Sequence, residues 1–170
     1  DDPTVPTLIS LDGDLEQDQL QYLVQQIAPN ADWIPSTTDS PAFASSPMVL
    51  MTTADLADGL NDLENPYTAL TTASTHRELA PGSAALPIRF VHTAPTRSNS
   101  GLQTLVAQYV AVSGKPAERL TLADVRANTG KVKAIQSKIT RYGASTGGLA
   151  KAMVQNGPFW ASIASVYESS

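Results

Sequence analysis

The sequence contains no cysteine, which excludes disulfides, thiolate metal sites and cysteine nucleophiles. No apolar run approaches the roughly 18–20 residues of a membrane-spanning helix. Neither a Gly-x-Ser-x-Gly nor a His-Glu-x-x-His motif is present. Aromatic residues make up only 6% of the chain and are not interleaved with basic ones. We therefore expect no cofactor, no bound metal, no nucleic-acid partner and no direct insertion of this chain into a membrane.

Positive charge is absent from the first part of the chain. Residues 1–76 carry twelve acidic side chains and no Lys or Arg, whereas residues 77–170 carry eleven Lys or Arg and four acidic side chains. Such asymmetry can mark a site for an anion or a charged tail. The alternative is that the two halves offset each other across one folded surface, and the sequence leaves both interpretations open.

The chain has 170 residues, of which 42% are hydrophobic, enough for one domain with a real core. Because it opens on Asp1 and closes directly after a strand-like run, we expect it to be a piece of a longer protein. Residues 1–32 read as a strand (7–11) and a helix whose apolar face holds Leu20, Leu23, Val24 and Ile27. Residues 33–170 read as an α/β lobe, with Trp33 anchoring an irregular stretch into the core.

Strand-like and helix-like segments alternate along the rest of the chain. Short apolar runs predict strands over 48–51, 88–91, 141–145 and 162–168. Between them, periodicity and capping residues predict helices over 54–60, 101–112, 121–127, 131–139 and 146–156, with one short helix within 61–87. This alternation is typical of a three-layer α/β fold with a mostly parallel sheet.

Three loops that follow predicted strands are rich in hydroxyls and glycine. In open α/β sheets, ligands lie at the carboxyl ends of strands, beside helix N-termini whose free N–H groups and dipole attract anions. Arg97 adds a guanidinium that can grip a carboxylate, phosphate or sulfate with two hydrogen bonds. The predicted ligand-binding residues are Thr52, Thr53, Thr96, Arg97, Ser98, Asn99, Ser100, Gly101, Ser145, Thr146, Gly147 and Tyr167. The alternative is that these loops only cap helices, with Ser98 or Asn99 as an N-cap.

Residues 92–103, His-Thr-Ala-Pro-Thr-Arg-Ser-Asn-Ser-Gly-Leu-Gln, resemble a signature of bacterial extracellular solute-binding proteins. The similar group is often joined to a von Willebrand factor type A domain. The segments 46–50 (Ser-Pro-Met-Val-Leu), 142–147 (Tyr-Gly-Ala-Ser-Thr-Gly) and 165–168 (Ser-Val-Tyr-Glu) fit the same pattern. The resemblance covers the chain from about Trp33 onward. It departs from the family at Ala94, where the pattern has an acidic residue.

The resemblance implies one lobe of a type II periplasmic binding protein, in which two α/β lobes close on a small solute. It implies a periplasmic or extracellular location and a membrane transporter or a fused von Willebrand-type domain as partner. A second hypothesis is a non-enzymatic interaction module that keeps the fold and has lost the ligand. A third is a hydrolase that uses His92 with Ser98 or Ser100. For His92 a structural role is favoured, and His76 is predicted to lie in a solvated loop.

Overall fold

The computed structural model describes residues 10–170, and they form two compact units, of which the first ends at Ser45 and the second is Ser46–Ser170. The predicted boundary between residues 32 and 33 falls inside the first unit. Of the predicted strand over 7–11, residues 7–9 lie outside the described part, and residues 10 and 11 are not in a strand.

The first unit contains α1 (Asp14–Ile27) and a short 3-10 turn, η1 (Thr37–Asp39). The helix is where periodicity predicts it, but its apolar stripe does not enter a core: Leu23 is 51% exposed and Ile27 84% exposed. The buried residue of α1 is Gln17, whose side-chain amide donates to the Pro35 carbonyl (2.6 Å) and to Ser40 Oγ (2.9 Å). The prediction that Trp33 is an anchor is also wrong, because Trp33 is 69% exposed.

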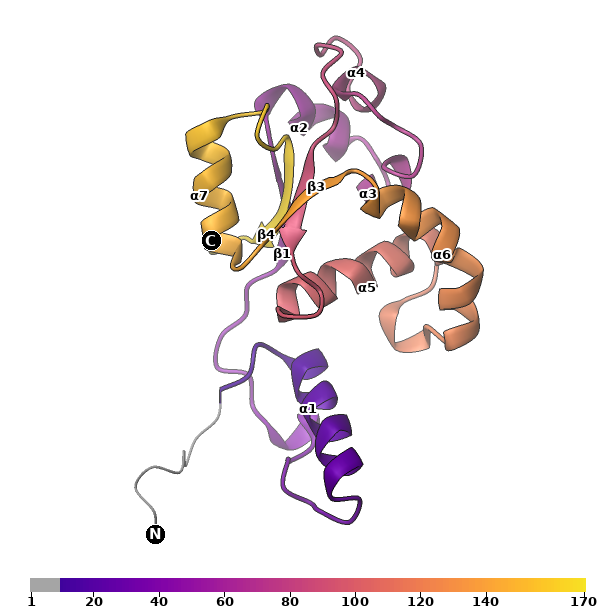
Figure 1. The fold of residues 1–170 in the computed structure, drawn as a ribbon, viewed down its shortest axis with the longest axis vertical. Helices are drawn as coiled ribbons and strands as arrows, with labels where there is room; N and C mark the ends of the chain where they lie inside the picture. Colours follow the sequence, from indigo (N-terminus) through magenta and orange to yellow (C-terminus); the bar gives the residue numbers. More distant parts are fainter. Residues whose placement is uncertain (1–9) are drawn as a thin grey trace. The chain divides into compact units, whose positions relative to one another are not determined.

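The second unit is a mixed α/β structure (Figure 1). Its strands are β1 (Met48–Thr52), β2 (Phe90–Thr93), β3 (Ile139–Gly143) and β4 (Ile163–Tyr167). Its helices are α2 (Ala54–Asn61), α3 (Pro66–Ala69), α4 (His76–Leu79), α5 (Asn99–Ser113), α6 (Leu122–Gln136) and α7 (Thr146–Asn156), with a 3-10 turn η2 (Ala117–Arg119).

The four strands form one open sheet in the order β1-β4-β2-β3. The strands β4, β2 and β3 run parallel, whereas β1 pairs with β4 in the antiparallel direction, with Met48 opposite Tyr167. The predicted α/β class with a mostly parallel sheet is confirmed. The reversed direction of β1 matters for the candidate site. The carboxyl end of β1 lies at the opposite end of the sheet from the carboxyl ends of β2, β3 and β4.

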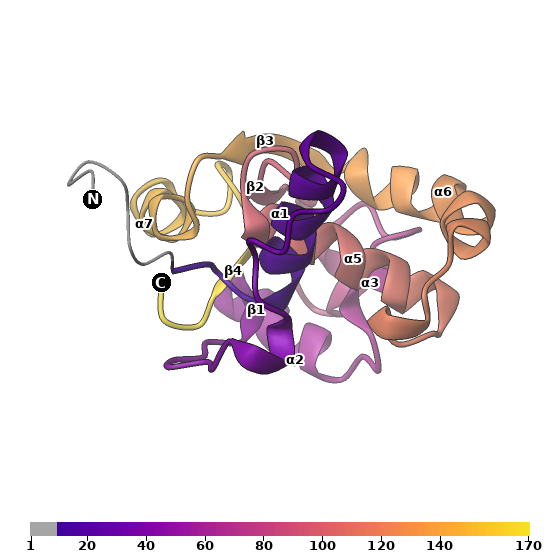
Figure 2. The same ribbon diagram turned by 90° about the horizontal axis from the view of Figure 1, so that it is seen from below.

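Helices cover both faces of the sheet, with α7 on one side and α5, α6 and α3 on the other (Figures 1 and 2). Side chains alternate along each strand, so Val91 and Ala164 pack with Leu149 and Met153 of α7. Phe90, Ile163 and the helical residue Ile135 lie in the larger core on the other face. Each face is therefore closed by its own apolar cluster.

The predicted helices over 121–127 and 131–139 are one continuous helix, α6. Gly130 lies inside this helix and does not interrupt it, because one glycine lowers helix stability by only about 1 kcal/mol relative to alanine. The helix begins with a capping box in which Thr121 and Asp124 satisfy each other's backbone N–H groups. Lys115 first, and Thr121 second, lower the pKa of the Asp124 carboxyl to about 2.

The side of α5 that is most deeply buried is polar. Sequence periodicity predicts an apolar face of Leu102, Leu105, Val106, Tyr109 and Val110, yet all of these are only half-buried. The buried stripe is instead formed by residues four apart, which are Ser100, Thr104 and Gln108. A buried polar side chain needs a partner, and the hydrogen bonds of this stripe lead to the candidate site.

Candidate functional site

The carboxyl ends of β2, β3 and β4 meet at one edge of the sheet, which we call the carboxyl edge. There Thr93 is paired with Gly143, and the Ala94 N–H donates to the Gly143 carbonyl at 3.3 Å. The chain leaves this edge twice to begin a helix, at α5 and at α7. The carboxyl edge thus brings together two of the three predicted loops and the end of β4 at Tyr167.

The segment Ala94–Gly101, which we call the entry segment, carries the chain from β2 into α5. Its turn is closed by the Ala94 carbonyl, which accepts from the N–H groups of Arg97 and Ser98, both at 3.0 Å. Ser98 occupies the N-cap position, but its hydroxyl does not accept from a helix N–H. The first turn of α5 therefore presents backbone N–H groups without the side-chain cap that a serine usually supplies.

The hydroxyls of the entry segment bond to one another and to the strand. Ser98 Oγ lies 2.8 Å from Ser100 Oγ, which lies 2.7 Å from Thr93 Oγ1. The Thr104 hydroxyl donates to the Ser100 carbonyl and lies 2.8 Å from Ser165 Oγ of β4. Sequence reasoning missed Thr93, Thr104 and Ser165. For Thr104 the available signal was the four-residue spacing of polar residues in α5, a helix that otherwise reads as apolar.

Gly101 is required by the packing of the entry segment on β2. A Cβ built on it would lie 2.3 Å from the Thr93 carbonyl oxygen and 2.8 Å from the Ala94 carbonyl carbon. These are backbone atoms that cannot move aside cheaply. Gly101 is among the predicted ligand-binding residues, but the space beside its Cα is filled by the chain itself.

Arg97 and Thr96 are exposed at the turn, and Asn99 is half-buried at the first position of α5. Within residues 10–170, no ion pair engages the Arg97 guanidinium. An exposed arginine directly before a helix N-terminus that lacks a side-chain cap is a favourable feature for an anionic group.

The start of α7 differs from that of α5. Ser145 is a conventional N-cap, because its hydroxyl accepts from the Gly148 N–H at 3.2 Å. Thr146 Oγ1 lies 3.0 Å from the Ser170 hydroxyl, which donates to it, and Gly147 is exposed with open space around its Cα. One of the N–H groups at the start of α7 is therefore already satisfied by the helix's own cap.

Thr52 and Thr53 do not lie at the carboxyl edge. Because β1 is antiparallel to β4, Thr52 pairs with Ile163 at the start of β4, and its hydroxyl donates to the Ser162 carbonyl at 3.0 Å. The prediction that three loops converge is wrong for these two residues. A local sequence pattern gives the position of a strand and says nothing of its direction.

Both histidines are fully buried. His92 Nδ1 lies 2.7 Å from the Thr93 carbonyl oxygen and Nε2 lies 3.3 Å from Gln136 Nε2, so neither ring nitrogen is paired with Ser98 or Ser100 as a hydrolase would need. Burial lowers the pKa of His92. The prediction that His76 is solvated is wrong, since its Nδ1 lies 3.2 Å from Asp55 Oδ2.

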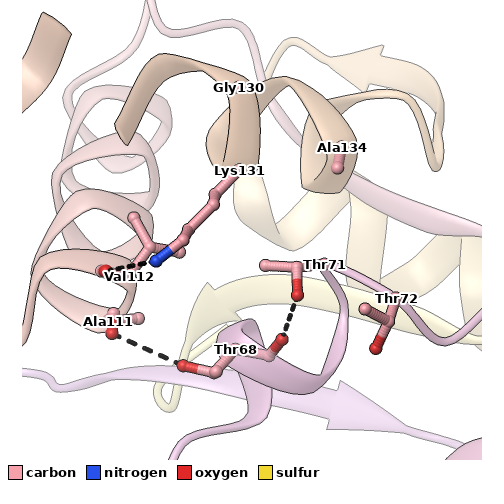
Figure 3. Close-up of a pocket in the computed structure, with 8 residues that line it drawn as sticks. All are labelled: Thr68, Thr71, Thr72, Ala111, Val112, Gly130, Lys131 and Ala134. Carbon is pink, nitrogen blue, oxygen red and sulfur yellow. Dashed lines mark hydrogen bonds between the residues drawn. The ribbon is translucent and has the colours of Figure 1, made fainter. Parts of the chain in front are cut away.

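A shallow depression of about 430 Å³ lies at the other end of α5, between α3, α5 and α6 (Figure 3). Its polar groups are already committed: the Thr68 hydroxyl donates to the Ala111 carbonyl, the Thr71 hydroxyl to the Thr68 carbonyl, and Lys131 Nζ to the Val112 carbonyl. The carbonyls at the C-terminal end of α5 also carry partial negative charge. The chemistry of this depression is therefore less suited to an anion than that of the entry segment.

Over the described range, 10–170, no three His, Asp or Glu side chains gather closely enough to hold a metal ion. None of the helices described there is both long and apolar enough to cross a bilayer.

A family model for bacterial extracellular solute-binding proteins matches residues 2–169. The chain belongs to this family. The match begins well before Trp33 and so includes the first unit as well as the second. No curated protein and no solved structure matches the chain significantly. The α/β architecture of the second unit is consistent with one lobe of a solute-binding protein, and proteins of this family generally bind a solute without transforming it.

Proposed function

We propose that the carboxyl edge binds a small polar or anionic solute through the entry segment. In this proposal Arg97 supplies the charge, and the first-turn N–H groups of Ser100 and Gly101 supply hydrogen bonds, with Thr96, Ser98 and Asn99 at the rim. The single observation that carries it is the α5 N-terminus, which lacks a side-chain cap and is immediately preceded by Arg97, an exposed residue without an ion-pair partner in the described part of the chain.

In the same proposal, α7 and β4 form a second wall. Ser145, Thr146 and Gly147 lie at the start of α7, and Tyr167 lies at the end of β4, all on the carboxyl edge. Because the Ser145 hydroxyl is engaged as a cap, this wall contributes backbone N–H groups and the Thr146 hydroxyl. Thr52 and Thr53 have no part in the site, because they lie at the opposite edge of the sheet.

The test is thermal unfolding of the chain against inorganic anions, organic acids, amino acids and sugars. A ligand that binds only the native state raises the melting temperature by mass action. The loss of a charge-assisted hydrogen bond in Arg97→Ala should weaken binding by about 1.5–3 kcal/mol, or about 10- to 150-fold. Lys151→Ala removes an exposed positive charge from α7 and is the matched control. If no compound in the panel shifts the melting temperature, or if both variants bind like the wild type, the proposed site is wrong.

The family description supports a periplasmic or extracellular location for this chain, and the absence of cysteine is compatible with it. We propose that the solute is passed to a membrane transporter or sensed by a fused domain, such as one of the von Willebrand factor type A kind. For a periplasmic location, we expect the chain to be protected from added protease in intact cells. We expect it to be digested once the outer barrier is opened.

One observation favours a second candidate function, a protein-interaction module. Large apolar side chains stand exposed on the first unit, with Tyr22 at 62%, Ile27 at 84% and Phe43 at 86%. Exposed large apolar side chains mark an interface where they gather into one patch. Under this alternative, Ile27→Ser would weaken binding to a fused or neighbouring domain and Arg97→Ala would not, which is the reverse of what solute binding predicts.

A further inference from the structure

The peptide that joins Thr93 to Ala94 is held at both of its polar ends. Its carbonyl oxygen lies 2.7 Å from His92 Nδ1, and its N–H donates to the Gly143 carbonyl. The same peptide supports the start of α5, because Gly101 packs directly against the Thr93 carbonyl. The next carbonyl, that of Ala94, accepts the two hydrogen bonds that form the turn. The geometry of the entry segment therefore depends on this one peptide.

The contact between His92 and Thr93 fixes where the imidazole carries its proton. A carbonyl oxygen can only accept a hydrogen bond, so Nδ1 must be the protonated nitrogen. The other nitrogen, Nε2, then holds a lone pair and accepts from the side-chain amide of Gln136. The hydrogen bond made by one ring nitrogen thus sets the tautomer that the other nitrogen needs.

Gln136 is itself held in the orientation that suits this tautomer. Its Nε2 also donates to Gln108 Oε1 at 2.8 Å, and its Oε1 accepts from the Tyr142 hydroxyl at 2.8 Å. The Tyr142 ring lies edge-on to His92, with the ring centroids 5.2 Å apart. Tyr142 is thus the ionisable group that faces His92 from β3, while α5 and α6 present the neutral amides of Gln108 and Gln136.

We propose that His92 is a positioning residue for solute binding: as its Nδ1–H tautomer, which the Thr93 carbonyl and the Gln136 amide both favour, it holds the Thr93–Ala94 peptide and with it the entry segment. This inference rests on the proposed function only where it says that His92 affects the affinity for the solute. The positioning itself is a property of the protein without solute. This role accounts for the position of His92 next to the entry segment without any catalytic function.

The first test uses the wild-type protein alone. Long-range ¹H–¹⁵N correlation spectra of the two histidines at neutral pH should show His92 protonated at Nδ1 and unprotonated at Nε2. The His92→Asn spectrum assigns the signals, because only those of His76 remain. A His92 ring protonated at Nε2 alone overturns the proposal, because that tautomer has no proton to donate to Thr93.

The second test compares variants that keep or remove the donor. Asparagine places its amide N–H near the position of Nδ1, so His92→Asn should keep amide hydrogen exchange of Arg97 and Ser98 close to the wild-type rate. His92→Leu keeps the apolar bulk and loses the donor, so exchange should rise about tenfold, as expected when one ordinary hydrogen bond is lost. Equal exchange in the two variants overturns the proposal.

Gln136→Met covers the case in which His92→Leu does not fold. It leaves His92 in place and removes the amide that donates to Nε2, which is one of the two groups that favour the Nδ1–H tautomer, so the Nε2–H form should become detectable. Gln155→Met makes the same chemical change on the exposed side of α7 and should leave the histidine spectrum unchanged. An unchanged tautomer in Gln136→Met would show that Gln136 does not select it.

The two proposals fail in different ways. If no solute in the panel binds but the tautomer and exchange results are as expected, the positioning role stands and the proposed function fails. If a solute binds His92→Leu as tightly as the wild type, the proposed function stands and His92 does not position the site.

Discussion

The two helices that begin at the carboxyl edge, α5 and α7, start in different ways. Both have a serine at the N-cap position, Ser98 and Ser145 respectively. Ser145 turns its hydroxyl to its own helix and accepts from the Gly148 N–H, whereas Ser98 turns its hydroxyl to Ser100 and so toward the strand. The same residue type therefore caps one helix and joins a buried hydroxyl cluster at the other.

This difference shows why a capping residue in a sequence does not settle whether a helix N-terminus is available to a ligand. At the start of α7, one of the first-turn N–H groups is satisfied by the helix's own cap. The start of α5 has no side-chain cap, and the exposed Arg97 directly precedes its N-cap residue. We therefore propose that the solute binds at α5, the helix whose N-terminus has no side-chain cap.

Among variants at the starts of α5 and α7, Gly101→Ala is expected to lower the free energy of unfolding most. A methyl group would meet the Thr93 carbonyl, and overpacking against fixed backbone costs about 3 kcal/mol. Gly147→Ala is the matched change at α7, where the Cβ would meet nothing within 4 Å. Denaturant unfolding of both variants measures the difference. Equal stabilities would mean that α5 does not pack against the end of β2 as described.

The next effect is a pH dependence of the free energy of unfolding that comes from His92, in the strand that leads into α5. The folded-state pKa of His92 is lowered by burial, so the unfolded chain takes up a proton more readily than the folded one. The contribution of the neutral His92 ring to the free energy of unfolding is fully present above the pKa of an ordinary histidine. It is lost as pH falls from there to the lower folded-state pKa, at up to about 1.4 kcal/mol per pH unit.

Unfolding free energies at pH 7.5 and 5.5, compared between the wild type and His92→Asn, isolate this contribution. The wild type should lose more stability on acidification than the variant does. If the variant loses as much, the pH dependence comes from other groups, and His92 is not held neutral in the folded protein.

A smaller effect separates the two serines. Ser145→Ala removes a side-chain cap and should lower the unfolding free energy by about 1 kcal/mol. Ser98→Ala removes no helix cap, so its direct effect on α5 should be smaller. Its cost should instead come from leaving Ser100 with one partner fewer. A larger loss of helix protection in α5 than in α7 would contradict the assignment of caps.

The smallest expected effect is that of Gly147→Ala taken by itself. Alanine is favoured over glycine inside a helix by about 0.5–1 kcal/mol, and the first turn should show at most that gain. A clear destabilisation would indicate that the start of α7 packs against something that the described structure does not place there.

Sequence patterns predicted the segments of the fold well where apolar runs are short and clearly bounded. The strand over 48–51 and the helix over 146–156 are both present within a residue or two of their predicted bounds. The direction of β1 could not be predicted, because pairing with β4 is a long-range choice. The continuity of α6 was not predicted, because residues 128–130 continue neither the apolar pattern of 121–127 nor that of 131–139.

The candidate site was predicted in part. Arg97, Ser98 and the start of α5 were identified because a polar loop follows a strand. The buried polar stripe of α5 was missed, since periodicity arguments count apolar residues and read the remaining ones as solvent-facing. The burial of His76 against Asp55 was missed for a similar reason, because its neighbours in sequence are polar.

The central claim, that the solute binds at the start of α5, is tested most directly by amide chemical-shift mapping. The ¹⁵N-labelled chain is titrated with whichever compound of the panel raises the melting temperature. The account predicts that the amides of residues 97–101 shift most, that those of 146–148 shift less, and that Arg97→Ala removes both changes. Shifts centred on residues 68–72 and 130–134, with those of 97–101 unmoved, would contradict it.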